Sequence, residues 1–304
     1  MADMQKKIEF SAFQFFKILF SILPRSACLA IGGVLGFVIY HADKKHRQIA
    51  LSNLNTAFGS RFSDVQQKRM AKASFKHFGR VFADIIKAGT MNRDKIRKLM
   101  SLEGTEHIEK ALSEGKGALI FSAHLGNWEM ATAMVSRIGK INVIARPLDN
   151  RLLENELLKI RNNLGANVIY KQQAARPILR ALEDNAMVAI LIDQNVVRNQ
   201  AVFVDFFGKA AATTPSLAAF FLKTRAPIIP VFCYPARSGR YRLMILRPLK
   251  IILTGNENKD VLKITQLCTK IIQDQIQENP KFWLWFHNRW KTRPEEEEKI
   301  LRER

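Results

Sequence analysis

The chain has 304 residues, of which 47% are hydrophobic and 25% are charged, as in a globular protein of one large domain or two modest ones. Its 48 Lys and Arg residues against 27 Asp and Glu give a formal net charge of +21, which favours nucleic acid, anionic membrane surfaces or acidic proteins as partners. The three cysteines are far apart and include no CxxC motif, which argues against a structural disulfide or zinc site and for a reducing compartment.

The N-terminal 42 residues are predicted to form a hydrophobic helical anchor. Residues 8–23 are rich in Phe, Ile and Leu, and the uncharged run 26–40 is shorter than the roughly 20 residues of an upright spanning helix. Joined together, the two runs can span a membrane at a tilt or lie partly embedded in it. No small-residue cleavage site follows, and the basic residues 44–47 favour a cytoplasmic position for the rest of the chain. A buried pair of core helices is the alternative.

Residues 43–90 are expected to be helical, with breaks at 53–55 and 59–60. Ser63 begins a helix that runs towards Ala88 and carries an aromatic face, which is typical of a core helix. A short link and a helix ending at Leu112 follow.

From residue 118 onwards, strands and helices alternate. The predicted strands are 118–122, 141–145, 167–170, 188–192, 202–206, 228–234 and 241–246, and the predicted helices are 127–138, 151–164, 174–183, 215–223 and 259–278. The turn 237–240 predicts a hairpin between the last two strands. Because the strands are continuously apolar, we expect an α/β fold with a mostly parallel central sheet flanked by helices.

His124 and Glu129 follow the apolar strand 118–122 and form the candidate catalytic pair. An imidazole can take a proton from a hydroxyl, and a carboxylate can hold the ring in the required tautomer. Five residues on a continuous helix would place the two side chains about 140° apart. The pair therefore requires His124 in a strand-to-helix turn, with Gly126 adopting unusual backbone angles and Asn127 capping the helix.

This segment resembles the HX4(D/E) motif of the lysophospholipid acyltransferase superfamily, and most closely the bacterial lipid A late acyltransferases. The resemblance covers residues 10–295 and includes several further blocks in the same order. These blocks are residues 50–58 (ALSNLNTAF), 146–150 (RPLDN), 193–195 (DQN), 202–208 (VFVDFFG), 212–214 (ATT) and 285–294 (WFHNRWKTRP).

The resemblance implies an enzyme that moves a fatty acyl chain from an acyl carrier protein thioester, or from acyl-CoA, to a hydroxyl of a phosphorylated lipid A precursor. It makes His124 the general base and Glu129 its partner, and it gives functional roles to Arg161 and Asp193. Arg161, Asp193 and Arg146 are expected to bind substrate, since a guanidinium suits phosphate and sugar-acid oxygens. No metal or other cofactor is expected, and no nucleic acid.

Several alternatives stay open at this stage. The acceptor can instead be another glycolipid, such as a mannosylated phosphoinositide, because close relatives with that activity share the Glu form of the motif. A basic membrane-binding or nucleic-acid-binding protein is the non-enzymatic alternative. Three tryptophans near the end of the chain, at 283, 285 and 290, either form an aromatic and basic surface at a membrane boundary or pack the last helix onto the domain.

The expected organisation is an anchor over residues 1–42, an acyltransferase domain over 43–294 and a charged tail over 295–304. The expected location is the bacterial inner membrane, with the catalytic domain on the cytoplasmic face.

Overall fold

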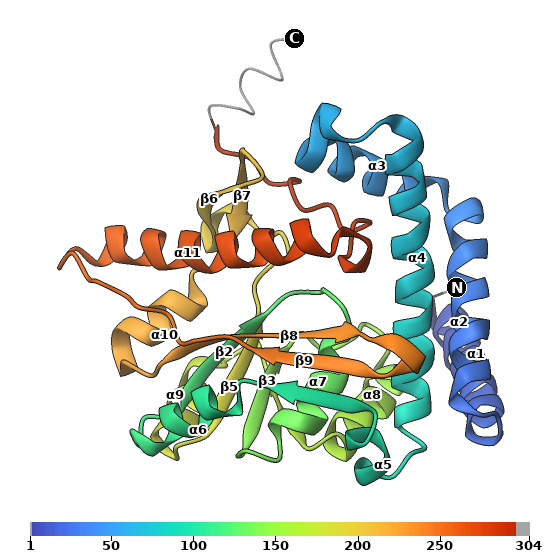
Figure 1. Cartoon of the computed structure of the whole chain (residues 1–304), viewed down its shortest axis with the longest axis horizontal. Helices are drawn as coiled ribbons and strands as arrows, with labels where there is room; N and C mark the ends of the chain where they lie inside the picture. The colour runs from blue at the N-terminus through green and yellow to red at the C-terminus, as the bar shows by residue number, and fades with distance from the viewer. Residues whose placement is uncertain (1, 296–304) are drawn as a thin grey trace.

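The computed structural model describes residues 2–295 and has an α/β fold in three layers (Figure 1). The strands of the central sheet are β1 (Met100–Glu103), β2 (Ala118–Ser122), β3 (Ile141–Ala145), β4 (Ala166–Tyr170), β5 (Met187–Leu191), β8 (Ile228–Pro235) and β9 (Tyr241–Ile245). Their order is β1-β9-β8-β2-β5-β3-β4. Neighbours pair in parallel except β8 and β9, which form the predicted hairpin. The expected mostly parallel sheet is confirmed.

Helices cover both faces of this sheet. One core is formed with α9 (Ala175–Glu183), α10 (Ser216–Thr224) and α11 (Glu257–Glu278). The opposite core is formed with α5 (Arg93–Arg97), α6 (Thr105–Ser113), α7 (Trp128–Val135) and α8 (Arg151–Asn163). A separate hairpin of β6 (Val202–Phe206) and β7 (Lys209–Thr213) contacts α11. Short 3₁₀ turns occur at η1 (Gly59–Arg61), η2 (Arg198–Gln200), η3 (Arg237–Gly239) and η4 (Pro280–Phe282).

Strand β2 explains both the core and the position of the site. Leu119 and Phe121 enter the core beneath α10 and α11, whereas Ala118 and Ile120 enter the core beneath α7, and all four are buried. A strand buried on both faces must be continuously apolar. Because β2 and β5 pair in parallel up to Ser122 and Leu191, the residues that follow them emerge side by side at one edge of the sheet.

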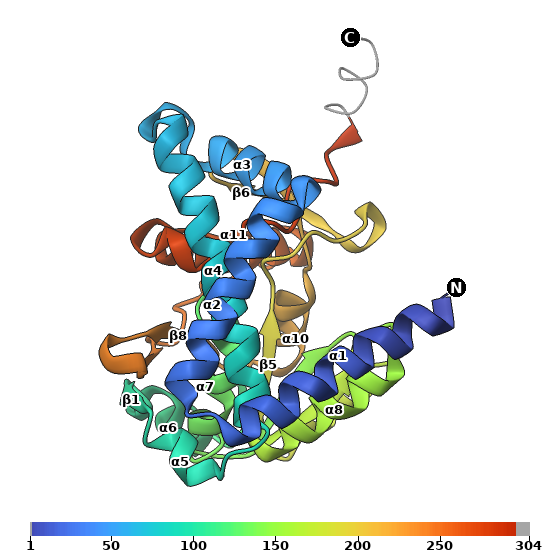
Figure 2. The same cartoon turned by 90° about the vertical axis from the view of Figure 1, so that its right-hand side faces the viewer.

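Four helices precede the sheet: α1 (Ala2–Ile22), α2 (Arg25–Ala42), α3 (Lys44–Phe58) and α4 (Asp64–Ala88). In Figure 2, α2 runs beside α4 while α1 extends across α8. The two helices α2 and α4 approach closely because glycines lie at their contact. A Cβ added to Gly36 would lie 2.2 Å from the carbonyl oxygen of Phe75, and one added to Gly32 would lie 2.4 Å from that of Gly79.

The sides of α1 and α2 that face away from the domain are apolar and exposed. Helix α2 is long and apolar enough to cross a membrane, and it is the one such helix among residues 2–295. The exposed apolar side chains of the two helices are Met4, Ile8, Phe15, Ile18, Ile22, Val34, Leu35, Phe37, Val38 and Ile39. The N-terminal segment is therefore packed on the domain along one side only.

Of two predictions for the N-terminal helices, one is confirmed and one is wrong. Ser63 caps α4 through a capping box with Gln66, as the predicted helix start requires. The predicted break at residues 53–55 is wrong, because α3 continues to Phe58. Asn53 has a tertiary role there, since its side-chain nitrogen donates to the carbonyl oxygens of Trp285 and His287.

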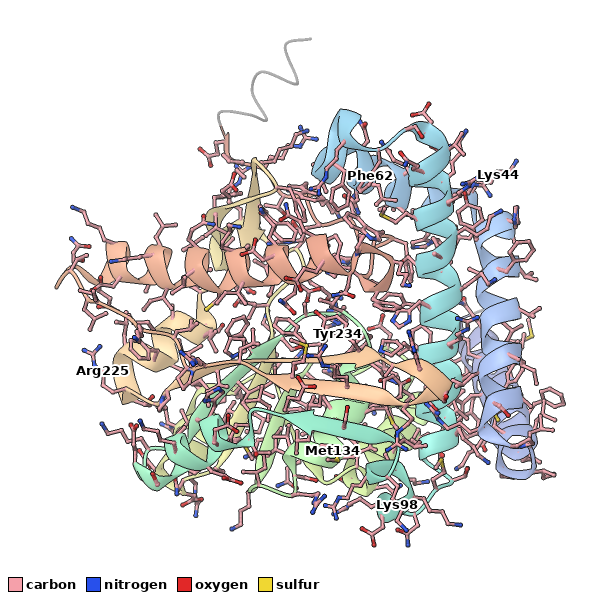
Figure 3. The ribbon with its side chains drawn as sticks, in the orientation of Figure 1. Lys44, Phe62, Lys98, Met134, Arg225 and Tyr234 are labelled. Atoms are coloured by element: carbon pink, nitrogen blue, oxygen red, sulfur yellow. The ribbon has the colours of Figure 1, made fainter. Side chains whose placement is uncertain are left out.

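The C-terminal segment packs into the molecule. Trp283, Trp285 and Trp290 are buried, and Arg289 is fully enclosed and donates to the carbonyl oxygen of Ala212. The alternative of an aromatic and basic surface is therefore wrong, and these side chains hold the end of the chain onto the domain. Tyr234, labelled in Figure 3, reaches from β8 towards α11 and donates to Gln275 at 2.9 Å. Of the predicted charged tail, only Glu295 lies within the described residues.

Candidate active site

The segment after β2 has the backbone that the His124–Glu129 spacing predicted. His124 lies in the strand-to-helix turn and Glu129 in the first turn of α7. Gly126 has φ +68°, and a Cβ there would lie 1.9 Å from the carbonyl oxygen of Cys233. Asn127 caps α7 by accepting from the backbone N–H of Met130. The turn therefore needs glycine at 126 and presents the His124 ring at the sheet edge.

Asp193 holds the His124 ring. Its Oδ1 lies 2.9 Å from Nδ1 of His124, and its Oδ2 accepts the His124 backbone N–H at 2.9 Å. The indole Nε1 of Trp283 donates to the same Oδ2 at 2.8 Å. A neutral imidazole that donates from Nδ1 has its lone pair on Nε2. Nε2 faces the side-chain nitrogen of Gln194 at 3.3 Å.

The Asp193 carboxylate stays ionised in this position. Burial opposes the charged form, but the charge of His124 and the hydrogen bonds from His124 and Trp283 lower the pKa of Asp193 to about 2. The parallel pairing of β2 and β5 explains why the two residues meet, since each follows the carboxyl end of its strand.

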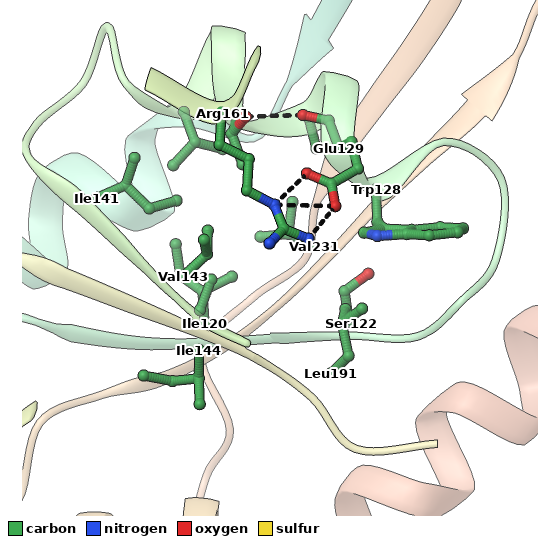
Figure 4. A pocket seen from close by; sticks show the side chains of 14 residues that line it. Ile120, Ser122, Trp128, Glu129, Ile141, Val143, Ile144, Arg161, Leu191 and Val231 are labelled. Atoms are coloured by element: carbon green, nitrogen blue, oxygen red, sulfur yellow. Dashed lines mark hydrogen bonds and ion pairs between the residues drawn. The ribbon is translucent and has the colours of Figure 1, made fainter. Parts of the chain in front are cut away.

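Glu129 has a different partner from the one we expected. It pairs with Arg161 of α8, whose Nε lies 3.1 Å from Oε2 and whose Nη2 lies 2.5 Å from Oε1 (Figure 4). The predicted pairing of Glu129 with His124 is corrected, because the Asp193 carboxylate takes that place. The ring of Trp128 packs edge-to-face against the imidazole, with the two ring centroids 4.8 Å apart.

The Glu129–Arg161 ion pair is nearly buried, with side-chain exposures of 7% and 13%. Burial opposes the charged guanidinium, but the hydrogen bonds and the charge of Glu129 raise the pKa of Arg161. If Arg161 binds substrate as predicted, its guanidinium must contact both the substrate and the Glu129 carboxylate.

Two cavities meet at this ion pair. A large cleft is lined by His124, Gln194 and Arg146, together with apolar residues of α1, α4 and α8. A smaller cavity lies between α7 and strands β2, β3 and β5, and its lining is mainly Ile, Val and Ala side chains (Figure 4). Glu129 and Arg161 line both cavities. The imidazole thus faces open space beside a narrow apolar chamber.

The remaining predicted residue, Arg146, lies at the rim of the cleft. It is 74% exposed and pairs with Asp149 at 3.2 Å. It is not in the same cluster as His124 and Asp193.

A chain of buried hydrogen bonds extends from the catalytic turn to the N-terminal helices. Asn127 donates to the Tyr241 hydroxyl at 2.8 Å, and Tyr241 donates to Asp84 of α4 at 2.6 Å. Asp84 also accepts two bonds of 2.6 Å from Arg25, the first residue of α2. The helix cap next to His124 is therefore tied to the start of α2.

Two contacts of the site were not assigned from the sequence. The indole N–H of Trp283 and the carboxamide of Gln194 lie beside the His124–Asp193 pair. Gln194 directly follows the predicted aspartate at the end of β5, which is the one sequence signal for it. Trp283 is 90 residues away in sequence from Asp193, so no local pattern indicates the contact.

The sequence is similar to those of known acyltransferases. The family model described as bacterial lipid A biosynthesis acyltransferase matches residues 3–292. A lipid A biosynthesis acyltransferase of Haemophilus influenzae is 25% identical over 93% of this chain and 88% of its own length. The lipid A biosynthesis palmitoleoyltransferase of Escherichia coli is 24% identical over 90% of this chain and 87% of its own length.

A relative with another acceptor is also similar. A phosphatidylinositol mannoside acyltransferase of Mycobacterium tuberculosis is 27% identical over 72% of this chain and 69% of its own length. The family match extends over both cavities, the His124–Asp193 pair and the buried C-terminal segment. The chain therefore belongs to the bacterial lipid A biosynthesis acyltransferases, a family of acyl-transferring enzymes.

Proposed function

We propose that this protein transfers a fatty acyl chain from an acyl carrier protein thioester to a hydroxyl of a phosphorylated lipid A precursor. The observation that carries the proposal is the His124 ring, which Asp193 holds at Nδ1 while Nε2 faces a large cleft. A histidine in this arrangement is a general base for an incoming hydroxyl. Acyl-CoA is the alternative donor.

In the proposed reaction, Nε2 of His124 takes the proton of the acceptor hydroxyl as its oxygen bonds to the thioester carbonyl carbon. Asp193 stabilises the imidazolium that forms, because its carboxylate remains ionised at neutral pH. The C–S bond then breaks, and the departing thiolate receives the proton from the imidazolium. The products are an ester and a free thiol.

The smaller cavity is the proposed site of the acyl chain. Its apolar walls suit hydrocarbon, and Glu129 and Arg161 lie where it meets the cleft. We assign these two residues to positioning the thioester end of the chain. Arg146, at the cleft rim, is the proposed contact for acceptor phosphate.

The basic surface supports the choice of partners. A net charge of +21 attracts both the acidic carrier protein and a phosphorylated glycolipid in an anionic leaflet. A mannosylated phosphoinositide is the second candidate acceptor, because a mycobacterial relative is named for that activity.

We test the reaction with purified full-length protein, lauroyl acyl carrier protein and a phosphorylated disaccharide lipid acceptor. His124→Ala should lower kcat by about 10² to 10⁴, the usual contribution of general base catalysis. His46→Ala is the matched control, since His46 is an exposed residue of α3. Equal turnover of His124→Ala and wild type would refute the proposed base. A mannosylated phosphoinositide acceptor in parallel reactions distinguishes the two acceptor classes.

We also propose that α1 and α2 lie in the cytoplasmic leaflet of the inner membrane without crossing it. The domain holds α2 along its length, from the Arg25–Asp84 ion pair to the Lys72 ammonium over the Phe37 and Tyr40 rings. Helix α1 is bound to α8 through the Lys17–Glu156 ion pair. A spanning α2 would bring these charged groups into hydrocarbon, at a cost of several kcal/mol.

Cysteine labelling tests this arrangement. The three native cysteines are buried, so Lys7→Cys and Lys45→Cys report on the two sides of α2 separately. An impermeant maleimide should label both positions in inside-out membrane vesicles and neither position in right-side-out vesicles. Labelling of the two positions from opposite sides would establish that α2 spans the membrane. This readout is independent of enzymatic activity.

A further inference from the structure

Acyl transfer needs hydrogen-bond donors for the oxyanion of the tetrahedral intermediate. The backbone N–H groups of the turn that carries His124 already donate to acceptors within the protein. The backbone N–H of His124 donates to Asp193, and that of Leu125 donates to the carbonyl oxygen of Ala123 at 2.7 Å. Gly126 and Asn127 donate to the carbonyl oxygens of Phe282 and Cys233 at 3.0 and 2.8 Å. Four consecutive backbone donors are thus committed to acceptors within the protein.

The polar side chains near the imidazole are mostly committed as well. The side-chain nitrogen and oxygen of Asn195 bond to Thr292, each at 3.0 Å. Arg161 directs Nε and Nη2 at Glu129. Gln194 differs from both, because its side-chain nitrogen lies against the reactive Nε2 of His124 itself.

The residues on each side of Gln194 are held by hydrogen bonds, Asp193 through its side chain and Asn195 through its backbone. Asp193 is held by His124 and Trp283, and the Asn195 backbone N–H donates to Nε2 of His287 at 3.0 Å. Residue 194 is therefore positioned by bonds to both neighbours, while its side chain lines the cleft. Such support anchors the point from which the Gln194 side chain reaches into the cleft.

We propose that the carboxamide of Gln194 is the oxyanion donor of the acyl transfer. This inference rests on the proposed function of the same site. In the free enzyme the amide nitrogen occupies the position, 3.3 Å from Nε2, that the acceptor hydroxyl must take. When the hydroxyl enters, the amide moves aside by about one hydrogen-bond length, about 3 Å, and meets the carbonyl oxygen of the thioester. Its N–H then stabilises the negative charge that develops there.

The experiment compares Gln194→Ala with wild type, using lauroyl acyl carrier protein and a phosphorylated disaccharide lipid acceptor. Loss of one oxyanion donor lowers kcat by about 10² to 10³. We expect that loss with KM changed by less than about threefold and with an unchanged apparent pKa in the kcat–pH profile. Gln48→Ala, at an exposed position of α3, is the matched control for folding and assay.

A second variant separates charge stabilisation from ring positioning. Gln194→Glu keeps the size of the side chain, but its ionised carboxylate cannot donate and repels an oxyanion, so its kcat at pH 8 should fall below that of Gln194→Ala. If Gln194 only holds the ring, the kcat–pH profile of Gln194→Ala shifts along the pH axis instead of dropping uniformly. A kcat of Gln194→Ala within threefold of wild type also overturns the proposal.

The controls distinguish the two proposals. An inactive wild type, or an active His124→Ala variant, would sink the proposed function itself. If wild type is active and His124→Ala is not, unchanged kinetics of Gln194→Ala contradict only the role of Gln194.

Discussion

The two carboxylates of the site, those of Asp193 and Glu129, are both buried but are stabilised in different ways. Asp193 accepts three N–H groups, from the His124 backbone, the His124 ring and the Trp283 indole. With a pKa of about 2, it remains charged at neutral pH. Titration of this carboxylate should therefore contribute nothing to the pH dependence of catalysis near neutrality.

Glu129 is stabilised by one strong partner, and its removal should be costly. In Glu129→Ala the nearly buried guanidinium of Arg161 loses its counter-charge, which costs about 3–5 kcal/mol of unfolding free energy. Asp149→Ala is the control, because the Arg146–Asp149 pair is 74% and 88% exposed and such pairs contribute about 0–1 kcal/mol. Urea unfolding in a fixed detergent measures both variants. Similar losses in the two would contradict the role assigned to burial.

At the residue scale, the residues of the site were easier to predict from the sequence than the contacts between them. His124 and its turn were predictable, because glycine and a capping asparagine occupy the positions that the spacing requires. The partner of His124 was not predictable. A spacing of five residues suggests Glu129, whereas the contact is with Asp193, which lies 69 residues further along the chain. The pairing of Glu129 with Arg161, across two helices, is equally invisible in a local pattern.

At the scale of elements, the contact between α2 and α4 depends on glycines at the helix interface. Gly36→Ala should destabilise the protein by about 1–3 kcal/mol, because its Cβ would meet the Phe75 carbonyl oxygen at 2.2 Å and backbone cannot move aside cheaply. Gly33→Ala is a matched control in the same helix. Its Cβ would meet only the side chain of Arg80, at 3.0 Å.

The two substitutions have the same intrinsic effect on helix stability, a gain of up to about 1 kcal/mol. We therefore expect Gly33→Ala to have an unchanged or higher melting temperature and Gly36→Ala to have a lower one. Thermal unfolding in a single detergent gives both values. Equal shifts would show that α2 does not rely on close approach to α4.

The elements that the sequence predicted are those with strong periodic patterns. Strands β2, β3 and β6 begin and end where predicted, because β-branched or aromatic residues occupy two to four of the five positions in each. Strands β1 and β7 were missed. Strand β1 has four residues, and β7 (KAAAT) contains three alanines, so their extended structure depends on pairing with β9 and β6 and not on propensity.

At the scale of the whole molecule, buried histidines make stability depend on pH. Burial lowers the pKa of His77 to about 4, from a value near 6.5 in the unfolded chain. Between these values the unfolded state binds a proton that the native state does not. The stability that His77 contributes is therefore complete above about pH 6.5 and is lost as the pH falls towards 4, by about 1.4 kcal/mol per pH unit.

His77→Gln removes this titration while it keeps a side-chain N–H donor for the carbonyl oxygen of Gly126. The slope of unfolding free energy against pH between 4.5 and 6.5 should fall by about 1 kcal/mol per unit, and unfolding in urea at several pH values measures it. A residual slope is expected, because burial also lowers the pKa of His287 to about 4. An unchanged slope would mean that His77 is accessible to protons in the native state.

The bonds from Arg25 through Asp84 and Tyr241 to Asn127 determine how the protein can be shortened. Asp84 is 1% exposed and faces Arg25, so a chain that starts at residue 43 would leave its carboxylate without the matching guanidinium. The apolar N-terminal helices are thus structural members of the protein. A fragment without them would keep a buried negative charge with no counter-ion beneath the turn that carries His124, and we expect it to be less stable than the full chain.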